Sequence, residues 1–251
     1  MLSFADLNKR ILTYMKTKYI LFDLDGTLLP MDQDEFTIKY MEALAKKMAG
    51  LGFEPKKLID TIWSGVFGML KNEGQKTNEE IFWDKFIEVY GEESTKYIPD
   101  FDEFYRNEFI AAKEGCYENN EVFKIINELK KKNVKLVLAT NPIFPAVATE
   151  RRIGWAGLNP SDFEMITTYE NSRYSKPNQK YYLEILDKIG AKPEECLMIG
   201  NDVSDDMSAT KIGVETFLIT DCLINRDNQD YSKFNHGTFD DFVKFIKDKI
   251  K

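Results

Sequence analysis

The chain has 251 residues, of which 43% are hydrophobic and 30% are charged, and its formal net charge at pH 7 is −8. This length suits one large domain or a core domain with a smaller insert, and the composition is ordinary for a globular protein. The acidic balance argues against nucleic acid and anionic membrane as partners. No run of 18 apolar residues and no secretory signal pattern appears, so we expect a cytoplasmic protein.

The cysteines and the single histidine give little sign of chemistry. Cys116, Cys196 and Cys222 are far apart and form neither a CxxC pair nor a zinc spacing, so we expect free thiols,. His236 would have to serve any mechanism of the Ser-His-Asp or Cys-His type, but no nucleophile elbow accompanies it,. We expect His236 in a surface loop.

Residues 1–17 precede the first predicted strand. Apolar residues between Phe4 and Tyr14 are spaced as on one face of a helix,. One interpretation is an accessory helix over 1–14, and the other is an upstream extension of a chain that starts at Met15.

The stretch that follows changes abruptly from apolar to polar. Residues 19–22 favour a buried strand, and Asp23, Asp25, Gly26 and Thr27 come directly after it,. Two carboxylates at i and i+2 of an extended segment point the same way, beyond the end of a strand where open α/β sheets place their chemistry. Two close anions in a pocket usually need a cation, and hard oxygen ligands favour Mg²⁺. The alternative is a strand followed by an ordinary Asp-Gly turn.

Residues 33–113 show no strand pattern, and their apolar side chains repeat at helical spacing,. We predict an insert of about four helices, the last of them over 99–112, because glycines and a capping sequence at 77–80 separate the stripes. The aromatic side chains are expected in the core of this insert rather than in a pocket, because helical stripes usually bury. They include Trp63, Phe67, Trp83 and Phe86.

From 117 onward, helical and strand patterns alternate. Such alternation predicts a parallel sheet with right-handed crossovers, and therefore an α/β fold. The predicted strands lie at 134–139, 163–168, 196–199 and 216–220. The predicted helices lie at 120–129, 145–154 and 178–190, before 213, and after 237.

Polar residues stand at or near the ends of these strands. Because the carboxyl ends of parallel strands share one edge of a sheet, we expect them to converge with the first two carboxylates. Each also has a simpler interpretation, as a helix N-cap, a solvated loop or an acidic turn. The residues are Thr140, Asn141, Lys176, Asn201, Asp202, Asp205 and Asp206.

With these motifs in this order, the chain resembles the haloacid dehalogenase (HAD) superfamily of Rossmann-like phosphotransferases. The resemblance covers 18–29 and 117–220. It implies a Rossmann-like doubly wound parallel sheet with an all-helical cap of the C1 type inserted after the first strand. The implied core domain is 1–32 with 114–251, and the implied cap domain is 33–113. The motifs are Asp23-Leu24-Asp25-Gly26-Thr27, Thr140-Asn141, Lys176-Pro177 and the acidic loop from Gly200 to Asp206.

The resemblance also implies catalytic roles. Asp23 would attack phosphorus and form an aspartyl-phosphate, a known role for carboxylate nucleophiles. Asp25 would protonate the leaving oxygen and then activate the water that hydrolyses the intermediate. Thr140, Asn141 and Lys176 would bind the phosphoryl oxygens.

The implied metal site consists of Asp23, Asp25 through its backbone carbonyl, Asp202 and Asp206, of which Asp206 would act through a water or orient Lys176. A straight count from Gly200 places Asn201 where the superfamily has its first acid, whereas a count from the acids favours Asp202. We expect Asp202 to be the ligand, because Mg²⁺ prefers anionic oxygen over a neutral amide. The alternative is that Asp202 only caps the following helix.

Together these features predict a Mg²⁺-dependent phosphatase that acts on a small phosphorylated metabolite. The acid at position 25 favours phosphate esters, since the resemblance implies no acid there in dehalogenases and a small residue in phosphonatases. One alternative is a phosphomutase of the same superfamily, similar to β-phosphoglucomutase; another is a non-enzymatic binding domain. We expect a monomer or weak dimer, and nothing in 33–113 specifies the substrate.

Overall fold

The computed structural model describes residues 17–132 and 134–250. The helix predicted over 1–14 lies outside these residues. Within them, a six-stranded sheet has the order β3-β2-β1-β4-β5-β6, and every neighbouring pair is parallel, as predicted. The strands are β1 (Tyr19–Phe22), β2 (Lys135–Leu138), β3 (Met165–Ile166), β4 (Cys196–Gly200), β5 (Glu215–Ile219) and β6 (Asn235–Gly237).

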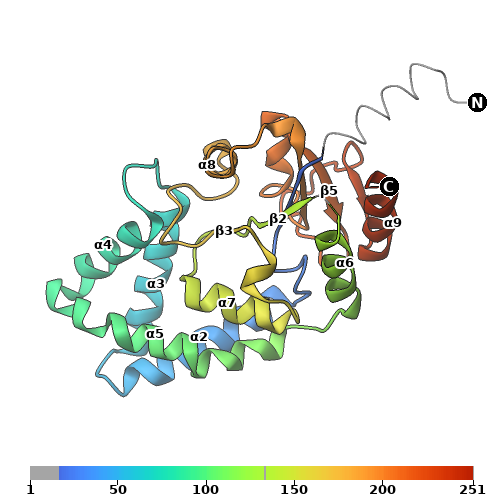
Figure 1. Ribbon diagram of the computed structural model, residues 1–251. Coiled ribbons are helices and arrows are strands. Elements are labelled where there is room, and N and C mark those ends of the chain that lie inside the picture. Colours follow the sequence, from blue (N-terminus) through green and yellow to red (C-terminus); the bar gives the residue numbers. More distant parts are fainter. Residues whose placement is uncertain (1–16, 133, 251) are drawn as a thin grey trace, which may run out of the picture.

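Helices cover both faces of the sheet, so the predicted doubly wound arrangement is confirmed (Figure 1). Alternate residues of β1 point to opposite faces. Ile20 and Phe22 pack in one hydrophobic cluster with residues of α6 and α9, whereas Tyr19 and Leu21 pack in another with residues of α8 and η5,. These elements are α6 (Asn120–Lys130), α8 (Gln179–Ile189), the 3₁₀ helix η5 (Met207–Ile212) and α9 (Phe239–Lys249).

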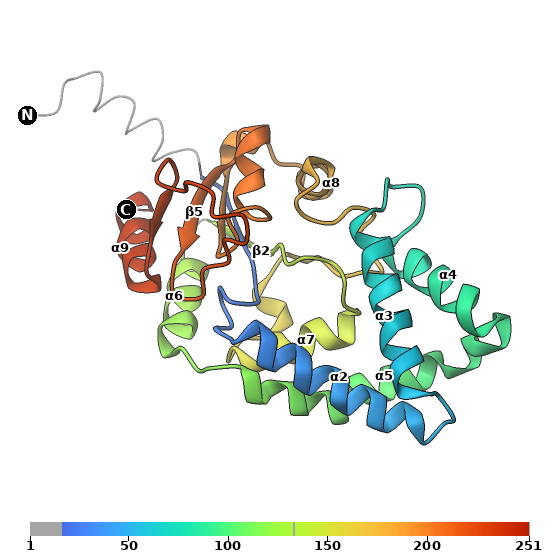
Figure 2. The same ribbon diagram turned by 180° about the vertical axis from the view of Figure 1, so that it is seen from behind.

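A helical insert lies between β1 and α6, beside the sheet (Figure 2). The chain enters and leaves it side by side, because Met31 forms an antiparallel bridge with Cys116. Thr77 begins α4 with the predicted capping box to Glu80,. The helices of the insert are α2 (Gln33–Ala49), α3 (Pro55–Leu70), α4 (Asn78–Tyr90), η1 (Glu92–Tyr97), α5 (Ile98–Arg106) and η2 (Glu108–Gly115).

The insert packs directly on the sheet-containing part of the chain. The rings of Tyr40 and Phe109 lie 5.6 Å and 6.2 Å from that of Phe144, which precedes α7 (Ala146–Trp155). Asn78 is completely buried, and its Nδ2 donates to the Pro142 carbonyl and to Ser175 Oγ. Hydrophobic and polar contacts therefore both hold the insert over the carboxyl ends of the strands.

Some element bounds differ from those predicted. The strand expected at 163–168 is reduced to β3, an edge strand with a single neighbour. The helix expected over 99–112 is split into α5 and η2 at Asn107, where ψ is −77°. The helix expected before 213 is η5, in which the Thr210 hydroxyl donates to a carbonyl three residues earlier, a local bond that competes with α-helical pairing,.

The strand β6 was not predicted, because three residues are too short for a periodic signal,. His236 lies in β6 rather than in a loop, and it is exposed as expected. No helix in residues 17–132 and 134–250 is long and apolar enough to cross a membrane.

Candidate active site

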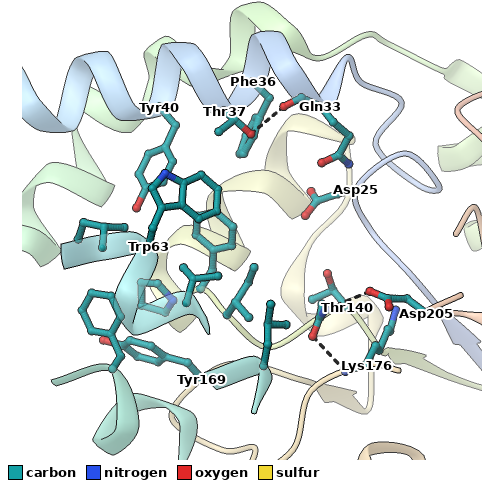
Figure 3. A pocket seen from close by; sticks show the side chains of 18 of the residues that line it. Asp25, Gln33, Phe36, Thr37, Tyr40, Trp63, Thr140, Tyr169, Lys176 and Asp205 are labelled. Atoms are coloured by element: carbon teal, nitrogen blue, oxygen red, sulfur yellow. Dashed lines mark hydrogen bonds between the residues drawn. The ribbon is translucent and has the colours of Figure 1, made fainter. Parts of the chain in front are cut away.

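A cavity of about 480 Å³ lies between the helical insert and the carboxyl ends of the strands (Figure 3). The structure brings most of the polar residues singled out in the sequence to this cavity, whereas Thr27 and Asn201 do not line it. Those that line it are Asp23, Asp25, Thr140, Asn141, Lys176, Asp202, Asp205 and Asp206.

Asp23, Lys176 and Asp206 form a buried chain of ion pairs. Lys176 Nζ lies 2.9 Å from Asp23 Oδ1 and 2.6 Å from Asp206 Oδ1. All three residues are at least nine-tenths buried. A lysine in this setting stays charged only if carboxylates compensate for the lost hydration. Lys176 and the two carboxylates therefore compensate one another's charge, and Asp23 lies where the cluster borders the cavity.

The ionisation of this cluster reflects burial as much as charge. Burial raises the pKa of the Asp23 carboxyl to about 8, while the Lys176 ammonium acts in the opposite direction,. Burial lowers the pKa of Lys176, but the carboxylates of Asp206 and Asp23 raise it by more, so it lies well above its usual value. Burial also raises the pKa of Asp205 to about 6. Further positive charge near these acids would therefore stabilise their ionised forms.

Asp25 has a different partner, which the sequence did not reveal. Its Oδ2 accepts a hydrogen bond from Nη1 of Arg152, a fully buried residue of α7. The Arg152 guanidinium also lies over the Phe144 ring, 4.2 Å from its centroid,. Asp25 Oδ1 is buried and has no hydrogen-bond partner. Arg152 thus fixes one oxygen of Asp25 and leaves the other unpaired.

The Thr140-Asn141 pair is fixed through its backbone and amide groups. The Thr140 carbonyl accepts hydrogen bonds from the hydroxyls of Tyr181 (2.8 Å) and Thr167 (2.7 Å). Asn141 Oδ1 accepts from the backbone N–H of Lys176 at 3.2 Å. These hydrogen bonds connect the end of β2 to the segment that carries Lys176 and to neighbouring residues.

In the acidic loop, Asn201 directly after Gly200 has a structural role. Its Oδ1 accepts from Thr27 Oγ1 at 3.0 Å, and its Nδ2 donates to the Cys222 carbonyl at 2.6 Å. It packs on Gly26, whose φ is +82° and where a Cβ would meet Asn201 Nδ2 at 2.2 Å,. Both polar atoms of Asn201 are therefore engaged away from the cavity.

Asp202 and Asp206 use their carboxylates differently. Asp202 Oδ1 accepts from the backbone N–H groups of Ser204 and Asp205, so the capping role considered above is present. Asp206 is engaged at both oxygens, because Oδ1 pairs with Lys176 and Oδ2 accepts from the Asp202 backbone N–H at 2.9 Å. The second carboxylate oxygen of Asp202 takes no part in these bonds, whereas both carboxylate oxygens of Asp206 do.

The donor set suits a hard cation that retains water ligands. Across the described ranges, no group of three or more His, Cys, Asp or Glu side chains is arranged as a ready metal cage. Mg²⁺ is usually held by one or two carboxylates together with substrate phosphate and water. Asp23 and Asp202 both line the cavity and supply such carboxylates.

The opposite wall of the cavity is aromatic. In Figure 3, Tyr40 and Trp63 lie on one side of the cavity, opposite Thr140 and Lys176. The expectation that the insert's aromatic residues belong to its core is wrong for part of the set. Of the four residues named, Phe86 and Trp83 are buried in the hydrophobic core as expected, although Trp83 also borders the cavity, whereas Trp63 and Phe67 are exposed and line it. Helical spacing does not distinguish a face that meets a core from one that meets a cavity.

The parallel sheet and the buried acid–lysine cluster at its carboxyl edge are typical of a Rossmann-like enzyme. The model of the family "haloacid dehalogenase-like hydrolase" matches residues 17–213, and the chain belongs to this family. The resemblance to the HAD superfamily that the sequence motifs indicated is thereby confirmed.

Similar proteins agree with this assignment. The chain is 28% identical over 205 residues to a phosphoglycolate phosphatase of Aquifex aeolicus, covering 80% of this chain and 84% of that protein. It is 25% identical over 241 residues to the pyrophosphatase PpaX of Oceanobacillus iheyensis, covering 94% and 96%. These relatives bear out the predicted phosphatase class.

Solved structures share the fold. A 2-haloacid dehalogenase from Pseudomonas syringae pv. Tomato has a TM-score of 0.61 at 17% identity, covering 93% of this chain and 98% of that one. A HAD phosphatase from Thermococcus onnurineus has a TM-score of 0.55 at 18% identity, covering 92% and 98%.

Proposed function

We propose that this protein hydrolyses phosphate monoesters of small metabolites with Mg²⁺, through an aspartyl-phosphate on Asp23. The observation that carries the proposal is the position of Asp23. Its carboxylate lies at the carboxyl end of the central strand, lines the cavity, and is paired with a buried lysine. Open α/β sheets bind their ligands at this place.

In the first step, a carboxylate oxygen of Asp23 attacks phosphorus as the bond from phosphorus to the ester oxygen breaks. The carboxyl group of Asp25, which lines the cavity, gives its proton to the departing alkoxide,. Arg152 holds Asp25 in place through Oδ2 and acts as a positioning residue. The products are the free alcohol and the aspartyl-phosphate.

In the second step, a water molecule attacks the phosphorus of the aspartyl-phosphate. Asp25 takes the water proton, the bond from phosphorus to Asp23 breaks, and inorganic phosphate leaves with Asp23 restored. Thr140, Asn141 and the Lys176 ammonium bind the phosphoryl oxygens. Phosphoryl transfer depends mainly on such positioning and charge stabilisation.

Mg²⁺, when bound, would neutralise charge on the transferring phosphoryl group. We assign its side-chain ligands to Asp23 and Asp202, with the backbone carbonyl of Asp25 as a further ligand. Of the two roles expected for Asp206, the proposal takes the positioning of Lys176 rather than contact with the metal through a water, because both Asp206 oxygens are already engaged. The division into a core of 1–32 with 114–251 and a cap of 33–113 stays part of the same proposal.

Release of inorganic phosphate from para-nitrophenyl phosphate tests this function. We expect turnover with Mg²⁺ and its loss when EDTA removes the metal, restored by added Mg²⁺. Turnover that continues in the presence of EDTA contradicts the proposal, and so does a lack of phosphate release with every metal tested. The phosphomutase alternative predicts that label passes from a sugar bisphosphate to a sugar monophosphate faster than inorganic phosphate is released. The phosphate-release assay gives the second of these two rates.

A further inference from the structure

The helical insert gives the cavity a wall that is strongly apolar and lacks positive charge. Among the described residues that line the cavity, those from 33–115 include no lysine or arginine, and their single ionised side chain is that of Asp102. The cations on the lining, Lys176 and Arg226, both belong to the other side. Lys176 is already paired with two carboxylates. A leaving group that reaches the insert would therefore meet no cation there.

Part of this apolar wall is open. Trp63 and Phe67 are 37% and 56% exposed, although both are large apolar side chains. They lie four residues apart on α3, so they share one face, and their rings lie 6.2 Å apart,. Exposed aromatic rings that adjoin a cavity are typical of a binding surface.

A strongly anionic leaving group fits this wall poorly. Carboxylates and phosphates are usually held by arginine or lysine, through charge-assisted hydrogen bonds. The named substrates of the relatives, phosphoglycolate and pyrophosphate, both carry a second anionic group at the end that would reach the insert. The lining that the insert supplies is mostly aromatic and aliphatic, and among the described residues Asp102 is its single carboxyl residue. Desolvating a second anionic group there without a partner is unfavourable.

We propose that the substrate is a phosphate monoester of an uncharged alcohol that bears an aromatic ring, with the ring lying against Trp63 and Phe67. This inference rests on the proposed function, because it places the phosphate at Asp23. The cavity of about 480 Å³ leaves room for such a ring beyond the phosphate, within the usual range for small-molecule sites,. An aromatic ring would cover the exposed faces of α3 and gain apolar contact on entry.

A set of esters with alkyl leaving groups tests the inference without large differences in leaving-group activation. We would compare kcat/KM for phenethyl phosphate and ethyl phosphate, with phosphoglycolate as the anionic comparison. Phenethyl phosphate should exceed ethyl phosphate roughly 10- to 100-fold, the range that hydrophobic pockets gain from added apolar groups. A higher kcat/KM for phosphoglycolate than for phenethyl phosphate overturns the inference.

Two matched phenylalanine variants locate the effect. Phe67→Ala should lower the ratio of phenethyl to ethyl phosphate at least about 5-fold, because alanine lacks the ring that would contact the phenyl group. Phe123→Ala is the control, since Phe123 is 53% exposed on α6 and does not line the cavity. It should keep the wild-type ratio. An unchanged ratio in Phe67→Ala contradicts the inference.

Binding to the Asp23→Asn variant separates this inference from the proposed function. Its Kd should be lower for phenethyl phosphate than for ethyl phosphate or phosphoglycolate. If the wild type releases no phosphate from any ester but this preference in Kd holds, the proposed function fails and the substrate class stands. If phosphate is released but phosphoglycolate binds more tightly, the function stands and the substrate class is wrong.

Discussion

The two sides of the cavity are built in different ways. On the strand side, acids from the strand ends and their loops form ion pairs with Lys176 and Arg152. On the insert side, helical faces present rings, two of them substantially exposed. The difference suggests that reaction chemistry and substrate preference reside in separate stretches of the chain.

This separation has a physical basis. A buried cluster of opposite charges tolerates little change, because removing one member leaves another uncompensated. An exposed ring contributes contact area and leaves no buried charge behind when it is replaced. Variants on the strand side should therefore affect every substrate, and variants on the insert side should change the ranking of substrates.

The largest effect is expected at the nucleophile. Asp23→Asn should lower kcat for every phosphate ester at least about 10³-fold, because it removes a group that acts together with its neighbours. Phosphate release under saturating substrate measures this. Thermal unfolding should show that the variant still folds, and wild-type turnover in a folded Asp23→Asn protein would exclude Asp23 as the nucleophile.

A smaller, substrate-dependent loss is expected at Arg152. Arg152→Met should lower kcat for ethyl phosphate by about 100-fold, the scale of positioned acid–base groups, because Asp25 loses its orientation,. Turnover of para-nitrophenyl phosphate should fall only a few-fold, since nitrophenolate leaves without needing a proton.

The neighbouring Arg151 gives the control, because it is only half-buried and does not line the cavity. Arg151→Met should leave both rates near those of the wild type. Equal losses for the two substrates in Arg152→Met would indicate general structural damage rather than a misplaced proton donor.

The acidic loop distinguishes a metal ligand from a structural residue. Asp202→Ala should raise the Mg²⁺ concentration for half-maximal activity at least about 10-fold, since even outer-shell partners cost roughly 10- to 100-fold in metal affinity. Asn201→Ala should instead lower the unfolding temperature, because it deprives Thr27 and the Cys222 carbonyl of their partners,. A stronger effect on Mg²⁺ dependence from Asn201→Ala than from Asp202→Ala would reverse the assignment.

The smallest effect is expected from adding charge to the aromatic wall. Compared with Phe67→Ala, which lacks the ring as well, Phe67→Arg should raise kcat/KM for phosphoglycolate relative to phenethyl phosphate by roughly 2- to 5-fold, because exposed ion pairs contribute only about 0.2–1 kcal/mol. The ratio of the two kcat/KM values in one preparation measures it. The same shift in Phe123→Arg would show that net charge, and not the cavity wall, is responsible.

The strand side could be predicted from the sequence because its signals are local. An apolar run of four residues ends at Phe22 and the acids follow at once, so β1 and its carboxyl end were predictable, and parallel topology brought the other loops to the same edge,. Arg152 gave no such signal, because its partner Asp25 lies 127 residues earlier in the chain. Nothing in the spacing around a lone arginine on a helix indicates that pairing.

The insert side was less predictable for a different reason. The apolar spacing of Trp63 and Phe67 is the same whether the helix faces a core or a cavity, so only tertiary packing decides,. The engagement of both Asp206 oxygens likewise depends on Lys176 arriving from another loop and on Gly200, where a Cβ would lie 2.1 Å from the Asp206 carboxylate. Such close approaches are set by the folded backbone and not by local sequence.

The central claim is that a phosphoryl group is carried on Asp23. Rapid acid quench of the wild-type enzyme with ³²P-labelled phenethyl phosphate, followed by peptide mapping, tests it most directly. We expect acid-stable, hydroxylamine-sensitive label on the peptide that contains Asp23 within one turnover, and none in Asp23→Asn. Steady release of phosphate without label on that peptide at any quench time would contradict the covalent mechanism.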